Sequence, residues 1–310
     1  MAKMKKNIVE SVRAKLLNIA KENKTSLDFI VLRYMQEKLL KRVFISRYKD
    51  NFVLKGGLFF LITKNINPRV TKDIDFLGIS IINKEKEIKE IFQEILSTKI
   101  EEEKNNDALI FETSKITCEP IIKDADYKGI RVNIVCLLGV IKKNLQIDIG
   151  HGDVVYPHVN YTNFPSLLDS ELENIATYTL ESVIAEKFEA MVKLSYSNSR
   201  MKDFYDIYNI CKNYNINGEE IKNAIALTFQ NRDTSLDQNN LDIFKDEFYM
   251  NEKKIIQWNS FIKKINISNL EFAEVMFLLK SFLSVIVDSI LNNSPLEKRW
   301  DYTSCKWIDN

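Results

Sequence analysis

The side chains best suited to chemistry are two aspartates, Asp73 and Asp75, within the apolar stretch Phe52–Gly78. Alternate side chains of an extended segment share a face, so the two carboxylates would lie together while Ile74 and Phe76 point into the core. Neighbouring carboxylates repel each other and lose hydration on burial unless a cation lies between them. Mg²⁺ carrying substrate phosphates is a common partner for such oxygen ligands. The pattern indicates metal-dependent chemistry on a phosphorylated substrate.

A glycine pair, Gly56 and Gly57, precedes the aspartates in the same stretch. Glycine lets the backbone approach a ligand closely, and its N–H groups can bind phosphate. Each motif alone is weak, because Asp-x-Asp is usually a strand end or surface pair and Gly-Gly is usually a turn. Their combination, with the segment Arg69–Lys72 directly before the acids, favours a phosphate-binding active site.

A third carboxylate, Asp148, lies in a later strand-like run. Leu145, Ile147 and Ile149 would face inward, which leaves Gln146 and Asp148 on the open face. The run Ile130–Val140 and the run Asn144–Ile149 predict a hairpin around Lys142 and Lys143. The alternative for Asp148 is an ordinary polar residue on the exposed side of that hairpin.

The order L-K-G-G, a helical spacer, then R-x-T-x-D-I-D resembles the AbiEii/AbiGii toxin family, a branch of the DNA polymerase β-like nucleotidyltransferases. Residues 11–17, 145–150, 185–190 and 202–206 also resemble landmarks of that family, in the family's order, so the resemblance covers most of the chain. One departure is Leu58, where many relatives carry Ser or Thr. Backbone N–H groups would then have to replace a phosphate-binding hydroxyl.

The resemblance implies that a nucleotide is transferred from an NTP, with Mg²⁺ or Mn²⁺ as cofactor, to an acceptor expected to be the tRNA 3′ end. It implies a toxin of a type IV toxin–antitoxin or abortive-infection system, whose cognate antitoxin acts without a tight protein complex. The expected catalytic residues are Asp73, Asp75, Asp148, Lys187 and Asp203, and the first three are the expected metal ligands. The expected nucleotide- or phosphate-binding residues are Lys55, Gly56, Gly57, Lys187, Arg200, Lys202 and Asp206.

The later candidates also have ordinary structural interpretations. Lys187 lies at the edge of an apolar helical stripe, where lysines usually extend their ammonium to water. Asp203 could stabilise a helix N-terminus. Arg33, Lys38, Lys41 and Arg42 follow one helical side, which indicates a solvated face rather than a track for a phosphate backbone.

Composition limits the classes of partner and compartment. The 310 residues carry a net charge of +1, so any basic surface for nucleic acid must be local. Four scattered cysteines and two histidines argue against a zinc site, a disulfide framework or a histidine-based triad. No apolar run reaches the length of a membrane span, and the basic start lacks the apolar core of a signal peptide. We expect a cytoplasmic protein with no membrane partner.

The expected fold is α+β, with a polymerase β-like nucleotidyltransferase core built on a mixed sheet. N-terminal helices flank it, and a C-terminal helical bundle follows. Residues 1–165 would form the nucleotidyltransferase domain and residues 166–310 a helical domain that completes the active site, with a linker at Tyr156–Pro165. Two alternatives stay open: an inactive NTP- or RNA-binding module of the same fold, and an enzyme that nucleotidylates proteins.

Overall fold

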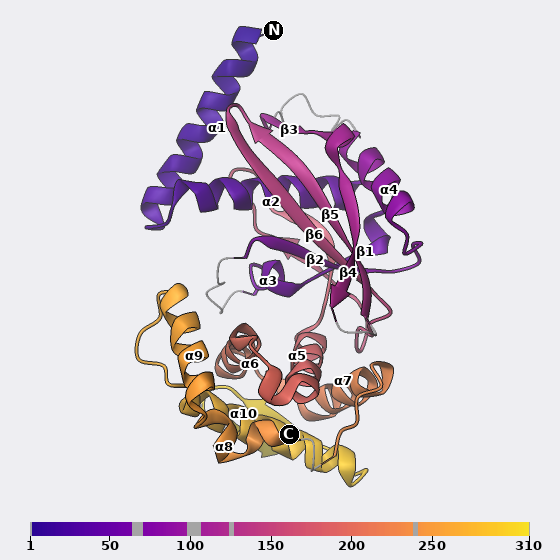
Figure 1. Cartoon of the computed structure of the whole chain (residues 1–310), viewed down its shortest axis with the longest axis vertical. Coiled ribbons are helices and arrows are strands. Elements are labelled where there is room, and N and C mark those ends of the chain that lie inside the picture. The colour runs from indigo at the N-terminus through magenta and orange to yellow at the C-terminus, as the bar shows by residue number, and fades with distance from the viewer. Residues whose placement is uncertain (1, 64–70, 98–106, 124–126, 238–240, 310) are drawn as a thin grey trace. The chain divides into compact units, whose positions relative to one another are not determined.

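The computed structural model describes residues 2–63, 71–97, 107–123, 127–237 and 241–309 (Figure 1). The chain divides into two compact units. The first comprises the described residues within 2–62, 71–152 and 160–177, and the second comprises residue 63 and the described residues within 153–159 and 178–309. The domain division expected after residue 165 stays a prediction.

The first unit is an eight-stranded mixed sheet with helices. Its helices are α1 (Ala2–Glu22), α2 (Leu27–Ile45), α3 (Gly56–Phe59) and α4 (Glu85–Ser97), with short 3₁₀ turns at Lys49–Asn51 and Thr113–Lys115. Its strands are β1 (Phe52–Lys55), β2 (Asp73–Gly78), β3 (Leu109–Phe111), β4 (Thr117–Lys123), β5 (Tyr127–Leu138), β6 (Ile141–His151), β7 (Asn160–Phe164) and β8 (Leu172–Thr177).

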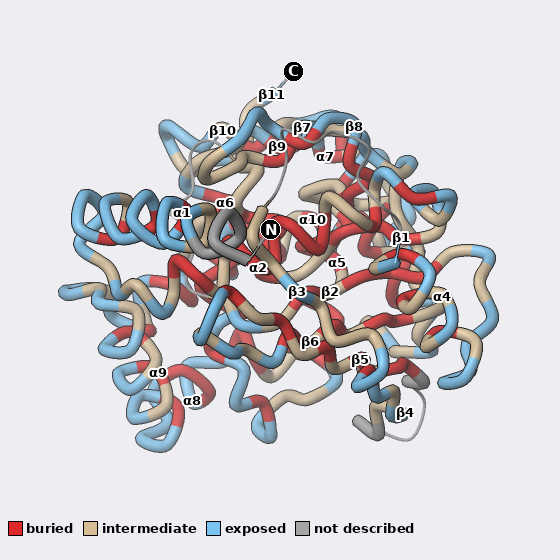
Figure 2. The backbone as a smooth tube through the Cα atoms, turned by 90° about the horizontal axis from the view of Figure 1, so that it is seen from above, coloured by how far each residue is buried: buried red, intermediate tan, exposed pale blue. Residues whose placement is uncertain are grey.

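The strand order is β3-β5-β6-β2-β1-β8-β7, with β4 paired to β5. The pairs β2–β6 and β1–β8 are parallel, and the other pairs in this sheet are antiparallel. The expected mixed sheet is therefore confirmed. Figure 2 colours the backbone by burial. From Asp73 to Phe76 in β2 and from Leu145 to Ile149 in β6, buried residues alternate with partly exposed ones, because the apolar side chains fill the core.

The hairpin of β5 and β6 turns earlier than expected. Leu138 pairs with Ile141 across Gly139 and Val140, and Gly139 has a φ of +59°, which glycine adopts at little cost. The predicted turn at Lys142 and Lys143 was wrong, since both residues lie within β6. The predicted linker at 156–165 was wrong in part, because its end forms β7, paired to β8.

Helix α2 begins after Ser26, whose side chain accepts a hydrogen bond from the Phe29 N–H. The solvated-face interpretation was wrong for Lys38, whose side chain is buried and forms ion pairs with Glu37 at 2.9 Å and Asp169 at 2.5 Å. The charge of Lys38 did not indicate exposure to solvent, because Glu37 of the same helix and Asp169 of a later loop pair with its ammonium.

The second unit is mainly helical. Its helices are α5 (Leu180–Leu194), α6 (Met201–Asn213), α7 (Gly218–Asn231), α8 (Asp246–Tyr249), α9 (Glu252–Lys264) and α10 (Phe272–Leu291), with 3₁₀ turns at Ser195–Ser197 and Asp242–Phe244. A small antiparallel sheet joins β9 (Ile216–Asn217), β10 (Lys298–Asp301) and β11 (Lys306–Asp309). In the part of the chain that the structure describes, no helix has the length and apolarity to cross a membrane.

Candidate active site

The three predicted carboxylates of the first unit come from two adjacent strands. Strand β2 runs parallel to β6, with Asp75 opposite Asp148 and Asp73 opposite Gln146. Their neighbours Ile74 and Ile147 are fully buried on the other face. Because directly opposed residues of a sheet point to the same side, Asp73, Asp75 and Asp148 share one partly exposed face.

Asp148 has a cationic partner that the sequence did not reveal. Arg131 of β5 lies directly opposite it, with Nε donating to Oδ1 and a terminal nitrogen donating to Oδ2, each at 2.8 Å. This two-point geometry is the strongest form of an arginine–carboxylate contact. The hydrogen bond to Asp148, opposed in part by desolvation, raises the pKa of Arg131. This pair of hydrogen bonds, here called the Arg131–Asp148 fork, therefore neutralises Asp148.

The cross-strand pairs extend this contact into a row of charge. Lys55 of β1 lies opposite Asp75, Asp75 opposite Asp148, Asp148 opposite Arg131, and Arg131 opposite Glu119 of β4. Two adjacent carboxylates are thus flanked in the register by one cation on each side. We call Lys55, Asp75, Asp148 and Arg131 the charged row.

The glycine pair makes room for side chains of the site. A Cβ atom on Gly56 would lie 1.9 Å from Asp75 Oδ2, and Gly56 has a φ of +67°. A Cβ atom on Gly57 would lie 2.5 Å from Thr71 Oγ1. Only residues without a side chain fit there. The adjacent Leu58 is buried in the core, which explains an apolar residue at that position.

We predict that Gly56→Ala both destabilises the protein and lowers its nucleotide transfer. The new methyl group overlaps the Asp75 carboxylate, and a left-handed φ adds strain of about 1 kcal/mol for a residue with a Cβ atom. Thermal unfolding and initial rates of Gly56→Ala, compared with those of Gly152→Ala, would check this. Gly152 also has a positive φ, +83°, but no atom lies within 4 Å of the position of its Cβ. A Gly56→Ala protein with rates equal to those of Gly152→Ala would contradict the steric argument.

The face that carries Asp73, Asp75 and Asp148, here called the acidic face, has oxygen donors of the type that a divalent cation binds. Asp73 and Asp75 present carboxylate oxygens on one open face, the ligands that Mg²⁺ and Mn²⁺ prefer. Asp148 lies next to them, but both of its oxygens are held by Arg131. Among the described residues, no group of three or more Asp, Glu, His or Cys side chains is arranged to hold a metal ion. A metal at Asp148 would therefore share these oxygens with the Arg131 guanidinium.

The remaining predicted site residues belong to the second unit, where four of them form an ion-pair cluster. Lys187 Nζ of α5 donates to Asp203 Oδ1 at 2.7 Å and to Asp206 Oδ2 at 2.8 Å, both on α6. Arg200 Nε lies 2.7 Å from the other oxygen of Asp203. Asp203 is fully buried, whereas Arg200 is half exposed. The structure thus brings together Lys187, Arg200, Asp203 and Asp206.

Burial alone would raise the pKa of Asp203, but the positive charges of Lys187 and Arg200 outweigh it and hold that pKa below its ordinary value. Lys202 lies on the exposed side of α6 and adds a smaller effect of the same sign. The ammonium of Lys187 therefore does not extend to water, because it is fixed between the carboxylates of Asp203 and Asp206.

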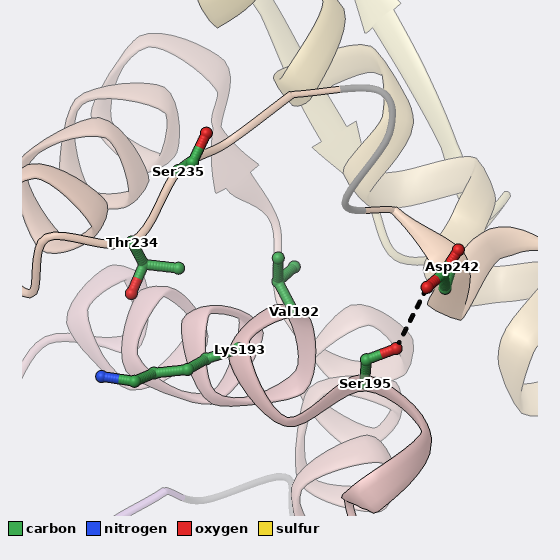
Figure 3. A pocket seen from close by; sticks show the side chains of 6 residues that line it. All are labelled: Val192, Lys193, Ser195, Thr234, Ser235 and Asp242. Atoms are coloured by element: carbon green, nitrogen blue, oxygen red, sulfur yellow. Dashed lines mark hydrogen bonds between the residues drawn. The ribbon is translucent and has the colours of Figure 1, made fainter. Parts of the chain in front are cut away.

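A separate hollow of about 270 Å³ lies in the second unit (Figure 3). Its lining joins the end of α5 to the segment after α7, and Ser195 Oγ donates to Asp242 Oδ2 at 3.4 Å. None of the predicted site residues lines this hollow, whose lining is Val192, Lys193, Ser195, Thr234, Ser235 and Asp242. It gives no support to a nucleotide site there.

Two solved structures from Helicobacter pylori resemble this chain. A candidate nucleotidyltransferase from Helicobacter pylori matches with a TM-score of 0.51 and 16% identity, covering 87% of this chain and 99% of that chain. JHP933 from Helicobacter pylori matches with a TM-score of 0.49 and 15% identity, covering 86% of this chain and 95% of that chain. The first match confirms the α+β class and likens its fold to that of a nucleotidyltransferase.

The family is shown by sequence. A profile described as the nucleotidyl transferase AbiEii toxin of type IV toxin–antitoxin systems matches residues 38–277, most of the chain. The chain belongs to this family, as its motifs predicted. No curated protein matches the chain by sequence. The protein is thus a nucleotidyltransferase toxin of the type IV class, while the roles of its individual residues stay predictions.

Proposed function

We propose that the protein transfers a nucleotide from an NTP to the 3′ end of a tRNA and needs Mg²⁺ or Mn²⁺ for this reaction. The observation that supports this most directly is the register of β2 and β6, which sets Asp75 opposite Asp148 with Asp73 on the same face. The close approach of Gly56 to the Asp75 carboxylate is compatible with this role, because a side chain at position 56 would displace that carboxylate. Both substrates are cytoplasmic, so the reaction takes place in the cytoplasm.

The first unit supplies acidic groups in this proposal. Asp73 and Asp75 hold the cation, which when bound neutralises charge on the phosphates and on the leaving pyrophosphate. Asp148, once released by Arg131, completes the metal ligands or accepts the proton of the acceptor hydroxyl. Lys55 and the backbone N–H groups of Gly56 and Gly57 bind phosphate oxygens.

The second unit supplies cations in this proposal. Lys187 binds phosphate, with Arg200 and Lys202 as further donors. Asp203 and Asp206 fix the Lys187 ammonium in position, because each accepts a hydrogen bond from it. Asp206 therefore acts through Lys187 and needs no contact with the nucleotide. A cognate antitoxin of a type IV system would act without a tight complex with this chain.

One observation favours a second candidate, an inactive module that binds NTP or RNA. Arg131 neutralises Asp148 in the manner of a structural ion pair. The presence of Asp73 and Asp75 beside it favours the enzyme, since a binding module has no need for three carboxylates on one face.

The test uses the purified protein with total RNA, Mg²⁺ and each of the four α-³²P-labelled NTPs in turn. We expect a labelled band of tRNA size with at least one NTP. EDTA should abolish it, and so should prior periodate oxidation of the RNA, which destroys the 3′-terminal diol. A labelled protein band would replace the tRNA acceptor with a protein. Nucleotide binding without label in any acceptor would establish the binding module instead.

A further inference from the structure

Arg131 forms a two-point contact with Asp148 on the acidic face and is not among the expected metal ligands. Its guanidinium engages both oxygens of Asp148 at 2.8 Å, and the two residues are directly opposed in the β5–β6 ladder. Gln146 adds longer contacts to the same oxygens at 3.3 and 3.4 Å. Every oxygen that Asp148 could offer to a metal is therefore already an acceptor.

Electrostatics opposes simultaneous occupation of Asp148 by both cations. A divalent ion bound to Asp75 and Asp148 would stand beside the Arg131 guanidinium, and like charges close together in a partly buried site repel strongly. Lys55 stands at the other end of the charged row, so the row is already neutral before a metal enters. Retention of the fork would therefore weaken metal binding.

The fork can open without a large penalty. The Arg131 side chain is 27% exposed and that of Asp148 is 15% exposed, so water reaches the guanidinium when it leaves the carboxylate. A fully buried pair would be strongly destabilised if it separated, whereas a partly solvated pair loses less. The contrast is with Asp203, which is fully buried and could not release Lys187 so easily.

We propose that Arg131 and the divalent cation compete for Asp148, and that the Arg131–Asp148 fork holds the nucleotide-free enzyme in a state of low metal affinity. This inference rests on the proposed function, because it takes Asp148 to be a metal ligand. The alternative is a positioning role, in which Arg131 orients Asp148 toward the metal. The two roles predict opposite signs, since removal of a competitor strengthens metal binding and removal of a positioning group weakens it.

The test measures Mn²⁺ binding without nucleotide, from the loss of the free-ion signal in electron paramagnetic resonance. We expect Arg131→Gln to lower the Kd for Mn²⁺ by about tenfold, the effect of removing a charge-assisted contact. Arg131→Lys keeps the charge but loses the fork, so a gain of about two- to threefold is expected. Arg47→Gln is the matched control, because Arg47 forms an exposed ion pair with Glu94 and should leave the Kd unchanged.

A double variant separates competition from a general loss of positive charge. Arg131→Gln with Asp148→Asn should show none of the gain of Arg131→Gln over wild type, because the contested ligand is absent. An unchanged or raised Kd in both Arg131→Gln and Arg131→Lys would overturn the proposal, and so would a full gain in the double variant. If the wild type transfers no nucleotide while Arg131→Gln still binds Mn²⁺ about tenfold more tightly, the competition stands and the proposed transfer falls. Thermal unfolding of each variant establishes that it is folded.

Discussion

Asp75→Asn should lower the rate of nucleotide transfer by a factor of about a thousand or more, with the protein still folded. Asparagine has nearly the shape of aspartate, so the close contact with Gly56 is kept. It lacks the negative charge, and the charged row would hold one carboxylate instead of two for a divalent cation. Loss of a preorganised group that acts on transition-state charge costs about a hundred- to a thousandfold, and loss of a metal ligand is expected at or above that range.

Asp309→Asn is the matched control, because its side chain is 92% exposed in β11 and lies outside the predicted site. Initial rates, circular dichroism and melting temperature would be measured for both variants and the wild type. Asp309→Asn should match the wild type in all three. A folded Asp75→Asn protein with more than a tenth of the wild-type rate would remove Asp75 from the catalytic residues.

The residues that share the acidic face could be predicted because they depend only on local alternation. Asp73 and Asp75 flank Ile74, and Asp148 lies between Ile147 and Ile149, so a period of two fixes their side of the sheet. That β2 and β6 are neighbours does not follow from local patterns, and the family resemblance supplied it. The helix starts at Ser26 and Thr179 are equally local features, since each side chain accepts a hydrogen bond from the N–H three residues ahead.

Arg131 could not be predicted because its partner depends on the register of the hairpin. A turn at Lys142 and Lys143 would have set Leu137 opposite Asp148. The observed turn at Gly139 and Val140 sets Arg131 there instead. A small error in turn position therefore exchanges an apolar neighbour for a guanidinium. The signal in the sequence was Gly139 itself, because glycine is common in two-residue hairpin turns, which need a positive φ.

The fit of Gly56 to Asp75 lay beyond sequence reasoning for a different reason. Between the two residues, 64–70 lie outside the described part of the chain. This range includes Arg69 and Val70 of the predicted motif. Their contact arises because Lys55, the last residue of β1, is paired directly with Asp75. The sequence indicated a phosphate-binding role for the glycines, which stays a prediction, and not their steric role.

Lys187→Met should destabilise the second unit by about 3–5 kcal/mol, the usual effect of removing one partner of a buried ion pair. Lys187 donates to both Asp203 and Asp206, which are almost inaccessible to water. Methionine keeps the apolar stem of the lysine but leaves two buried carboxylates without their shared cation. Urea unfolding at pH 7 would measure the loss. Lys253→Met, at an exposed lysine on α9, should change stability by less than about 0.5 kcal/mol.

The pH dependence of that loss follows from Asp203. Its folded pKa is lowered in the wild type, so its stabilisation is present above the unfolded pKa and disappears as the pH falls through the folded pKa. Without Lys187, desolvation would dominate and raise the folded pKa, so the variant would favour the protonated acid. The stability difference between wild type and Lys187→Met should therefore narrow between pH 7 and pH 4. A constant difference over that range would show that the loss comes from packing.

A double variant decides whether the buried charge causes the loss. Asp203→Asn alone leaves Lys187 with Asp206, and Lys187→Met alone leaves both carboxylates buried. Because Asp203→Asn removes one of those charges, the double variant Lys187→Met with Asp203→Asn should be more stable than Lys187→Met alone. The double-mutant cycle should give a coupling of about 1–3 kcal/mol. Additive losses would mean that Lys187 stabilises the unit through its stem, and Arg200 would then be the cation that keeps Asp203 charged.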